Sequence, residues 1–180
     1  MNDINKPIQQ DKQEEADSGE SKTTALYDRF AEVTHNTFES GKEKGRDAWE
    51  RSMDVARQKM AAAGEFSAEQ GEAFKLYLRR DLDQTVIDAR KLGKEAKEAL
   101  HPARLGAGAL STFGKLMHAV GDTLTAFSEK VEEKLLYQAG EITMAGTLTC
   151  TSCGHKIHLK KTSVVPPCPA CQSTSFSKGY

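Results

Sequence analysis

Four cysteines near the C-terminus have the residue type and the spacing of a metal site. They form two CxxC pairs, Cys150 with Cys153 and Cys168 with Cys171, and 14 residues lie between the pairs. Two residues between paired cysteines let one tight turn direct both sulfurs at the same ion, and a second turn completes a tetrahedron of thiolates. The spacing therefore predicts that all four cysteines bind one Zn²⁺ per chain.

Four sulfur ligands would close the coordination sphere of the zinc, so the sequence predicts a structural metal rather than a catalytic one. A catalytic zinc site keeps one position open for water and normally has three protein ligands. The chain also offers no nucleophile with a matched base and no glycine-rich phosphate loop. We therefore expect a non-enzymatic protein without a small-molecule substrate.

A rubredoxin-like electron carrier is a further hypothesis, because such proteins also bind their metal through two CxxC turns. Glycine usually follows both turns in those proteins. Here Gly154 follows the first turn, where the backbone needs a residue tolerant of positive φ, but Gln172 follows the second. A thioredoxin-like redox enzyme is not indicated, since the residues around Cys150 and Cys168 lack the βαβ context of such a site. We therefore place zinc above iron.

Lysines in the same region raise a nucleic-acid-binding alternative. Lys156, Lys160 and Lys161 lie on and just beyond a predicted strand, where they could contact phosphates. Together with Lys178 and against Glu141, the protein groups of the region sum to +3. Four thiolates with one Zn²⁺ add −2, which leaves about +1 and a weak field for phosphates. The alternative function is a transcription-related ribbon that binds nucleic acid through Lys156, Lys160 and Lys161.

The elements around the cysteines are predicted to be short strands. β-favouring residues precede the first CxxC turn at Ile142, Thr143 and 147–149, and residues 156–160 follow it. A ribbon of this size buries too little apolar surface to fold alone, whereas structural zinc contributes on the order of 10 to 16 kcal/mol in comparable peptides. We therefore expect residues 138–180 to form a rubredoxin-like zinc ribbon whose folding requires the metal.

Two helices are predicted in the first part of the chain. Apolar residues recur at steps of three and four from Leu26 to Thr37, and this series closes near Gly41. A second series starts after Gly45 and stops at Gly64, a residue that commonly ends helices. The positions predicted to be buried are Leu26, Phe30, Val33 and Thr37 in the first helix and Trp49, Met53, Ala56, Met60 and Ala63 in the second.

A longer third helix follows. Ser67 and Gln70 form a capping box at its start, and Pro102 ends it, because proline disfavours helical backbone in the residue before it. Basic residues on this helix, including Arg79 and Arg80, alternate with acidic ones such as Asp81, which predicts a solvated face with partners on the same helix. The predicted apolar stripe is Phe74, Leu78, Leu82, Val86, Ala89, Leu92, Ala96 and Leu100.

A fourth helical stretch has the pattern of a coiled-coil seam. Its apolar positions alternate by three and four over three heptads, at Leu110, Phe113, Met117, Val120, Leu124, Phe127 and Val131. Apolar stripes on long helices must be buried against each other or against a partner. We therefore predict that residues 23–137 form an α-helical stalk, hairpin or bundle. A protein partner or a second copy of the chain is expected to bind these helices, and the seam favours a dimer.

Composition and charge place these units in a soluble protein. The chain has 180 residues, of which 38% are hydrophobic, 28% charged and 7% aromatic, and its formal net charge is −1. A near-neutral chain has no global field that would attract nucleic acid or an anionic membrane. Residues 1–21 lack the apolar segment of a secretory signal, and no apolar run is long enough to span a bilayer. We expect a cytoplasmic protein without membrane association, whose residues 1–22 form a disordered acidic tail.

The chain contains the motifs Gly140-Glu141, Gly146-Thr-Leu148-Thr-Cys150, Gly64-Glu65-Phe66-Ser67 and Leu78-Arg79-Arg80-Asp81-Leu82. Together these motifs resemble an uncharacterised bacterial family of small zinc-ribbon-containing proteins with a helical N-terminal region. The likeness extends from about Ala48 to Tyr180 and is most specific in the last 40 residues. It implies a zinc ribbon on a helical stalk in a bacterial cytoplasm, and hence a mainly α fold with a small β ribbon.

Overall fold

The computed structural model describes residues 8–99 and 135–179, with side chains over 19–88 and 135–179. Three helices come first: α1 spans Ile8–Ser40, α2 spans Arg46–Ala62 and α3 spans Ala68–Ala99. Six short strands follow, so the predicted fold of a mainly α protein with a small β ribbon is confirmed. The fourth helix and the coiled-coil seam predicted at 110–131 lie outside the described residues.

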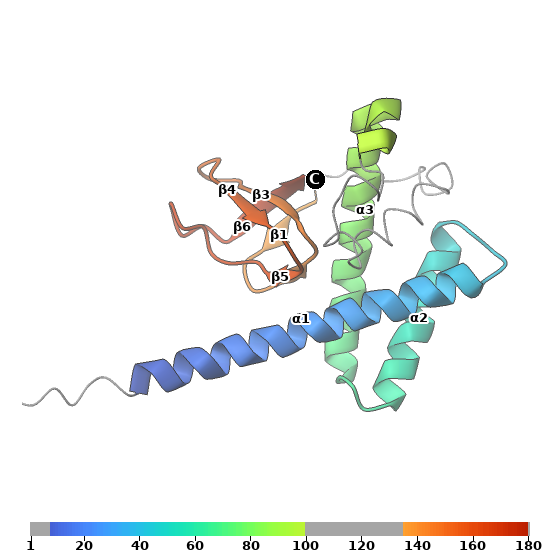
Figure 1. Ribbon diagram of the computed structural model, residues 1–180, viewed down its shortest axis with the longest axis horizontal. Coiled ribbons are helices and arrows are strands. Elements are labelled where there is room, and N and C mark those ends of the chain that lie inside the picture. Colours follow the sequence, from blue (N-terminus) through green and yellow to red (C-terminus); the bar gives the residue numbers. More distant parts are fainter. Residues whose placement is uncertain (1–7, 100–134, 180) are drawn as a thin grey trace, which may run out of the picture.

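Helices α2 and α3 lie side by side, and α1 crosses both of them (Figure 1). Figure 1 shows α1 running across both α2 and α3, with its N-terminal part extending beyond them. This part includes residues 8–22, for which the composition predicts a disordered tail. Glutamine, glutamate and lysine make up eight of these 15 residues and are good helix formers. The predicted boundary at residue 22 therefore does not coincide with the start of a helix.

The buried face of α1 differs from the predicted one. Of the four predicted positions only Phe30 is fully buried, whereas Tyr27 and Phe38, one residue after predicted positions, are 0% and 1% exposed. Their rings determine the packing: Tyr27 meets Phe74 of α3 edge to face at 5.6 Å between centroids, and Phe38 meets Trp49 of α2 at 5.2 Å. Aromatic pairs favour this geometry, so the helix presents its large rings to the other two helices.

The predicted stripe of α2 faces the core except at Ala63, which is exposed, and the α3 stripe faces it from Phe74 to Val86. The later stripe positions Ala89, Leu92, Ala96 and Leu100 lie outside the residues whose side chains are described. Charged residues beside these stripes form ion pairs between α2 and α3. The partners on α3 come earlier in the chain as those on α2 come later, so the two helices are antiparallel. The ion pairs are Arg46–Asp83 at 2.8 Å, Arg79–Glu50, Lys75–Asp54 at 2.5 Å and Arg57–Glu72 at 3.2 Å. The prediction that Arg79 would find its partner on its own helix is therefore wrong. None of the helices in the described ranges has the length and apolar content needed to cross a bilayer.

The predicted capping box is present at the start of α3. The Ser67 hydroxyl accepts a hydrogen bond from the Gln70 backbone N–H at 3.2 Å, and the Gln70 side-chain oxygen accepts one from the Ser67 N–H at 3.1 Å. We expect Ser67→Ala to lower the free energy of unfolding by about 1 kcal/mol, because a backbone donor of the first turn loses its acceptor. Urea unfolding would measure this change. Ser40→Ala is the control, since the exposed Ser40 hydroxyl only donates to a carbonyl at the end of α1.

The ribbon consists of a four-stranded antiparallel sheet with the order β1-β6-β3-β4 and a two-stranded sheet of β2 and β5. Its strand β4 is at one edge of the larger sheet and pairs with β3. The strands flank both CxxC turns, as predicted. Their bounds are Tyr137–Gln138 for β1, Ile142–Thr143 for β2, Gly146–Cys150 for β3, Lys156–Leu159 for β4, Ser163–Val164 for β5 and Ser175–Gly179 for β6.

The ribbon is docked on the helices and shares a core with them. It lies beside α3 and α1 (Figure 1). Ile142 and Met144, which are 3% and 0% exposed, belong to the same buried cluster as the aromatic residues of α1, α2 and α3. Arg80 of α3 forms an ion pair with Glu141 of the ribbon and stacks over the Tyr137 ring at 3.9 Å. The interpretation of Arg80 as part of a solvated helix face is therefore also wrong.

Candidate metal centre

The two CxxC turns have the same backbone geometry. In each turn the first cysteine donates its N–H to the carbonyl five residues later, and its own carbonyl accepts the N–H of the residue four positions later. These hydrogen bonds orient both cysteines of a pair toward the other turn. In the first turn they are Cys150 N–H to His155 O at 2.9 Å and Gly154 N–H to Cys150 O at 3.0 Å; in the second, Cys168 N–H to Ser173 O at 2.9 Å and Gln172 N–H to Cys168 O at 2.8 Å.

Equivalent positions after the two turns have left-handed backbone. Gly154 has φ 75°, and Gln172 has φ 59° although it carries a side chain. The sequence suggested that Gln172 sets the second turn apart from a rubredoxin-like turn, where glycine usually occurs. The structure shows instead that Gln172 adopts the conformation that glycine would adopt. A turn with Gln172 therefore differs from one with glycine in its conformational energy and not in its backbone shape, because a side chain disfavours the left-handed conformation.

Exchanging residues at these two positions should change stability in opposite directions. We expect Gln172→Gly to raise the free energy of unfolding of the metal-loaded protein by up to about 1 kcal/mol, because it removes the left-handed strain. Gly154→Ala should lower it by about 1 kcal/mol, since nothing lies within 4 Å of the added methyl group and backbone strain is the main cost. Thermal unfolding of both variants with metal bound measures the pair. A destabilised Gln172→Gly protein would contradict the strain argument.

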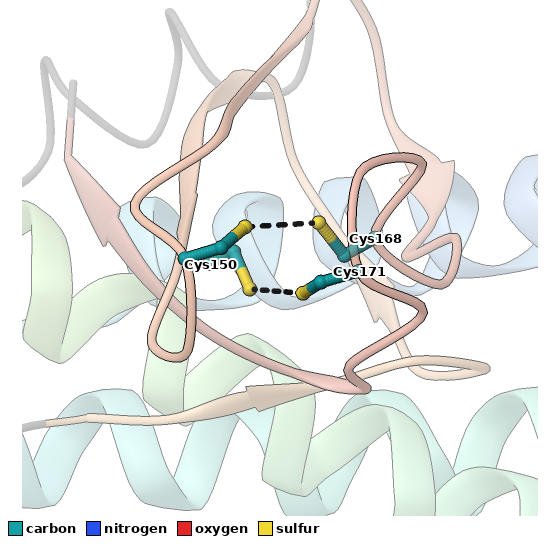
Figure 2. Close-up of side chains that lie close together, drawn as sticks. Cys150, Cys168 and Cys171 are labelled. Carbon is teal, nitrogen blue, oxygen red and sulfur yellow. Dashed lines mark hydrogen bonds between the residues drawn. The ribbon is translucent and has the colours of Figure 1, made fainter.

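The four sulfurs converge between the two turns, as Figure 2 shows for the labelled cysteines. The sulfurs of Cys150 and Cys171 are 3.6 Å apart, those of Cys153 and Cys168 are also 3.6 Å apart, and all four lie within 4.8 Å of one another. A disulfide requires a sulfur separation of about 2 Å. Zinc–sulfur bonds of about 2.3 Å in a tetrahedron separate the sulfurs by about 3.8 Å. The cluster therefore fits a tetrahedral metal ion and contains no disulfide.

Each turn contributes one buried and one exposed cysteine. Cys150 and Cys168 are 2% and 0% exposed, whereas Cys153 and Cys171 face solvent. The buried sulfurs lie in the apolar core of the ribbon, a cluster that also contains Tyr137, Leu148, Val165 and Phe176. The core of the ribbon thus includes half of the metal site, and the packing around Phe176 and the geometry of the sulfurs depend on each other.

The four thiols do not ionise independently. Burial would raise the pKa of Cys150, but hydrogen bonds from the backbone N–H groups of Cys153 and Ser152 outweigh it and lower that pKa to about 6. At Cys171 the Ser173 backbone N–H lowers the pKa, yet the neighbouring sulfurs and burial raise it to about 12. A charge on one sulfur thus opposes charge on the others. All four become thiolates together only where a cation compensates them, as Zn²⁺ does.

The predicted phosphate-binding lysines are accessible, but the basic surface is smaller than the sequence suggested. Lys156, Lys160 and Lys161 are exposed on β4 and in the turn that follows it. Lys178 is buried, and its side chain points into the interface with the helices. The turn after β4 is also fixed to α1, because the Thr162 hydroxyl donates to the Asp28 carboxylate at 2.6 Å.

A buried polar cluster at this interface was not identified from the sequence. Asp81 of α3 is 0% exposed and accepts hydrogen bonds from the Met144 backbone N–H at 2.8 Å, the Thr143 hydroxyl at 2.7 Å and the Tyr27 hydroxyl at 3.2 Å. Its position contained a signal: it follows Leu78 by three residues and so falls on the buried stripe of α3. A carboxylate on such a stripe needs a buried partner, and the partner is Lys178.

The comparisons with known proteins agree with this geometry. A family model described as a zinc-ribbon containing domain matches residues 36–179, from the C-terminal part of α1 to the last strand. No curated protein matches the chain, and no solved structure does.

Proposed function

The chain belongs to the family of zinc-ribbon containing domains, and from this premise we propose that it binds one Zn²⁺ per chain through Cys150, Cys153, Cys168 and Cys171. The observation that carries the proposal is the convergence of four sulfurs within 4.8 Å, from two turns of equivalent backbone geometry. When bound, the ion supplies a cross-link between the turns. The four cysteines fix the position of the ion, and their thiolates compensate its charge.

The role of the metal in this proposal is structural, and the protein is not an enzyme. Support comes from the number of sulfurs, since four thiolates complete a tetrahedron and leave no position for a reacting water. Two of the sulfurs also form part of the apolar core of the ribbon. The free state of the cysteines suits a reducing compartment, and we propose the cytoplasm as the site of action.

The helices are the proposed site of contact with a protein partner or with a second copy of the chain. Leu76 of α3 is 60% exposed and Val55 of α2 is 36% exposed, so large apolar side chains remain on the outer faces of the helices. Sedimentation equilibrium of the zinc-loaded protein tests self-association. A monomeric mass at micromolar concentration would contradict the dimer that the seam at 110–131 predicts.

A second candidate function is sequence-independent binding of nucleic acid. It is favoured by the exposure of Lys156, Lys160 and Lys161 along one edge of the ribbon. Lysine contacts of this kind give affinity that falls with salt. Fluorescence anisotropy with single- and double-stranded probes at low salt is the test, and the triple lysine-to-alanine variant is the control. Equal binding by both proteins, or no binding by the wild type, would contradict this candidate.

Native mass spectrometry of untagged protein purified without added metal tests the main proposal. One zinc per chain is the expected result, and His155→Ala should retain it because His155 is exposed beside the first turn. Cys168→Ser is expected to lose the metal. Bound iron would favour the electron-carrier hypothesis instead, and a wild-type protein without metal would overturn the proposal. Copurified nucleic acid in the spectrum would support the second candidate function.

A further inference from the structure

The strands that carry the metal site also carry the residue that holds the ribbon on the helices. Cys150 at the end of β3 is paired with Phe176 of β6, and both lie in the ribbon core. Lys178 follows Phe176 by two residues, so it projects from the same face of β6. The pairing of β6 with β3 therefore positions Lys178, and the metal turns at the ends of these strands stabilise that pairing.

Lys178 reaches the helices through a fully buried ion pair. Its ammonium group donates to the Thr143 hydroxyl at 2.7 Å and to the Met144 carbonyl at 2.9 Å, and it lies 3.4 Å from the Asp81 carboxylate. Both side chains of the pair are 0% exposed. The ribbon supplies three groups that contact the Asp81 carboxylate: the Lys178 ammonium, the Thr143 hydroxyl and the Met144 backbone N–H. The carboxylate is thus satisfied inside the protein while the ribbon is docked.

This arrangement makes docking an all-or-none event. A buried charge without its partner is strongly unfavourable, so a partly opened interface would leave Asp81 or Lys178 in a poorly solvated state. Full separation exposes both groups to water but also exposes apolar surface. Ile142 and Met144 would leave the cluster that they form with Tyr27, Leu78, Leu82 and other core residues of the helices. The docked state and the fully separated state are therefore each favoured over a partly opened interface.

We propose that the ribbon is a metal-dependent cover for the apolar face of α1 and α3 around Asp81. With metal bound, β3 and β6 stay paired and Lys178 is held on Asp81. Loss of the metal disorders the ribbon, withdraws the partners of Asp81 and exposes this helix face. The inference rests on the proposed metal binding by the four cysteines, and it adds that the helices respond to metal occupancy.

Reciprocity between docking and metal binding gives the first test. If docking favours the metal-bound ribbon, then weakening the interface must weaken metal binding by the same factor. A competition titration of the full chain with a chromogenic zinc chelator should give about 5- to 150-fold weaker zinc binding for Asp81→Asn. Asp83→Asn is the matched control, because Asp83 pairs with Arg46 of α2 and not with the ribbon. Wild-type zinc affinity in Asp81→Asn would overturn the proposal.

Hydrogen exchange on the wild-type protein gives a second test that does not depend on a variant folding. After removal of zinc by chelation, amides of residues 74–86 of α3 should exchange faster, whereas those of α2 should change less because α2 packs on α1 and α3. Unchanged exchange in 74–86 would overturn the proposal. Metal analysis of the same samples separates the two ideas: a protein that never held metal contradicts the proposed function, whereas a zinc-loaded protein with metal-independent exchange contradicts the coupling alone.

Discussion

Substituting serine for Cys150 is expected to abolish tight zinc binding and to unfold the ribbon. Structural zinc contributes on the order of 10 to 16 kcal/mol to small zinc-binding peptides, more than a ribbon of this size gains from its own core. The substitution also places a hydroxyl in the apolar cluster that contains Cys168 and Phe176. Loss of the ribbon resonances in a heteronuclear NMR spectrum, together with loss of zinc by mass spectrometry, would confirm the expectation.

The helices should survive this change with reduced stability. They have a core of their own, in which Trp49 of α2 meets Phe38 of α1 and the ring of Phe74 of α3 meets that of Tyr27. Far-UV circular dichroism should therefore retain most of its helical signal, while the thermal midpoint falls because Ile142 leaves the shared cluster. His155→Ala is the control and should keep both zinc and midpoint. Collapse of the helical signal would show that the helices cannot fold without the ribbon.

The second large effect is expected from Lys178→Met, which removes one half of the buried ion pair. The free energy of unfolding of the zinc-loaded protein should fall by about 3 to 5 kcal/mol, because the Asp81 carboxylate stays buried without its cation. Burial lowers the pKa of Lys178, and the nearby Asp81 carboxylate partly offsets this effect. The ion pair with Asp81 therefore offsets part of the cost of burying the ammonium in the wild-type protein. Urea unfolding at constant zinc concentration measures the change.

A double variant separates the ion pair from ordinary packing. Asp81→Asn combined with Lys178→Met should lower the free energy of unfolding by less than the sum of the two single changes. Both charges are then removed, so no buried charge is left without its partner. Lys156→Met on the outer strand β4 is the matched control for loss of a lysine, and it should change stability little because Lys156 is exposed. Strict additivity of the two core substitutions would show that the pair contributes no coupling.

Local signals in the sequence located several helix ends and both CxxC turns. Gly41, Gly45 and Gly64 mark helix ends within a few residues, and the capping box at Ser67 starts α3 as predicted. These features depend on residues close in sequence, where turn and capping chemistry operate. The spacing of the four cysteines is of the same kind, since each turn spans only a few residues. The pairing of β3 with β6 then brings the two turns together.

Docking of the ribbon could not be predicted in this way. Asp81 and Lys178 are 97 residues apart, and each has neighbours in the sequence that suggest a simpler, solvated role. Arg80 was misinterpreted for the same reason, because its partner Glu141 is 61 residues away. The apolar residues of α1 do recur with a helical period, as predicted. The large rings of Tyr27 and Phe38, rather than the residues just before them, determine which face of the helix is buried.

The position of β4 at the edge of the larger sheet has a consequence for solubility. An edge strand presents hydrogen-bonding groups along its outer side, and these can recruit strands from other molecules and begin aggregation. Lys156 and His158 project from β4 into solvent, and Lys160 and Lys161 follow directly. Positive charges along such an edge repel a second copy that approaches in the same way. The lysines at this edge thus disfavour edge-to-edge association of two copies of the chain.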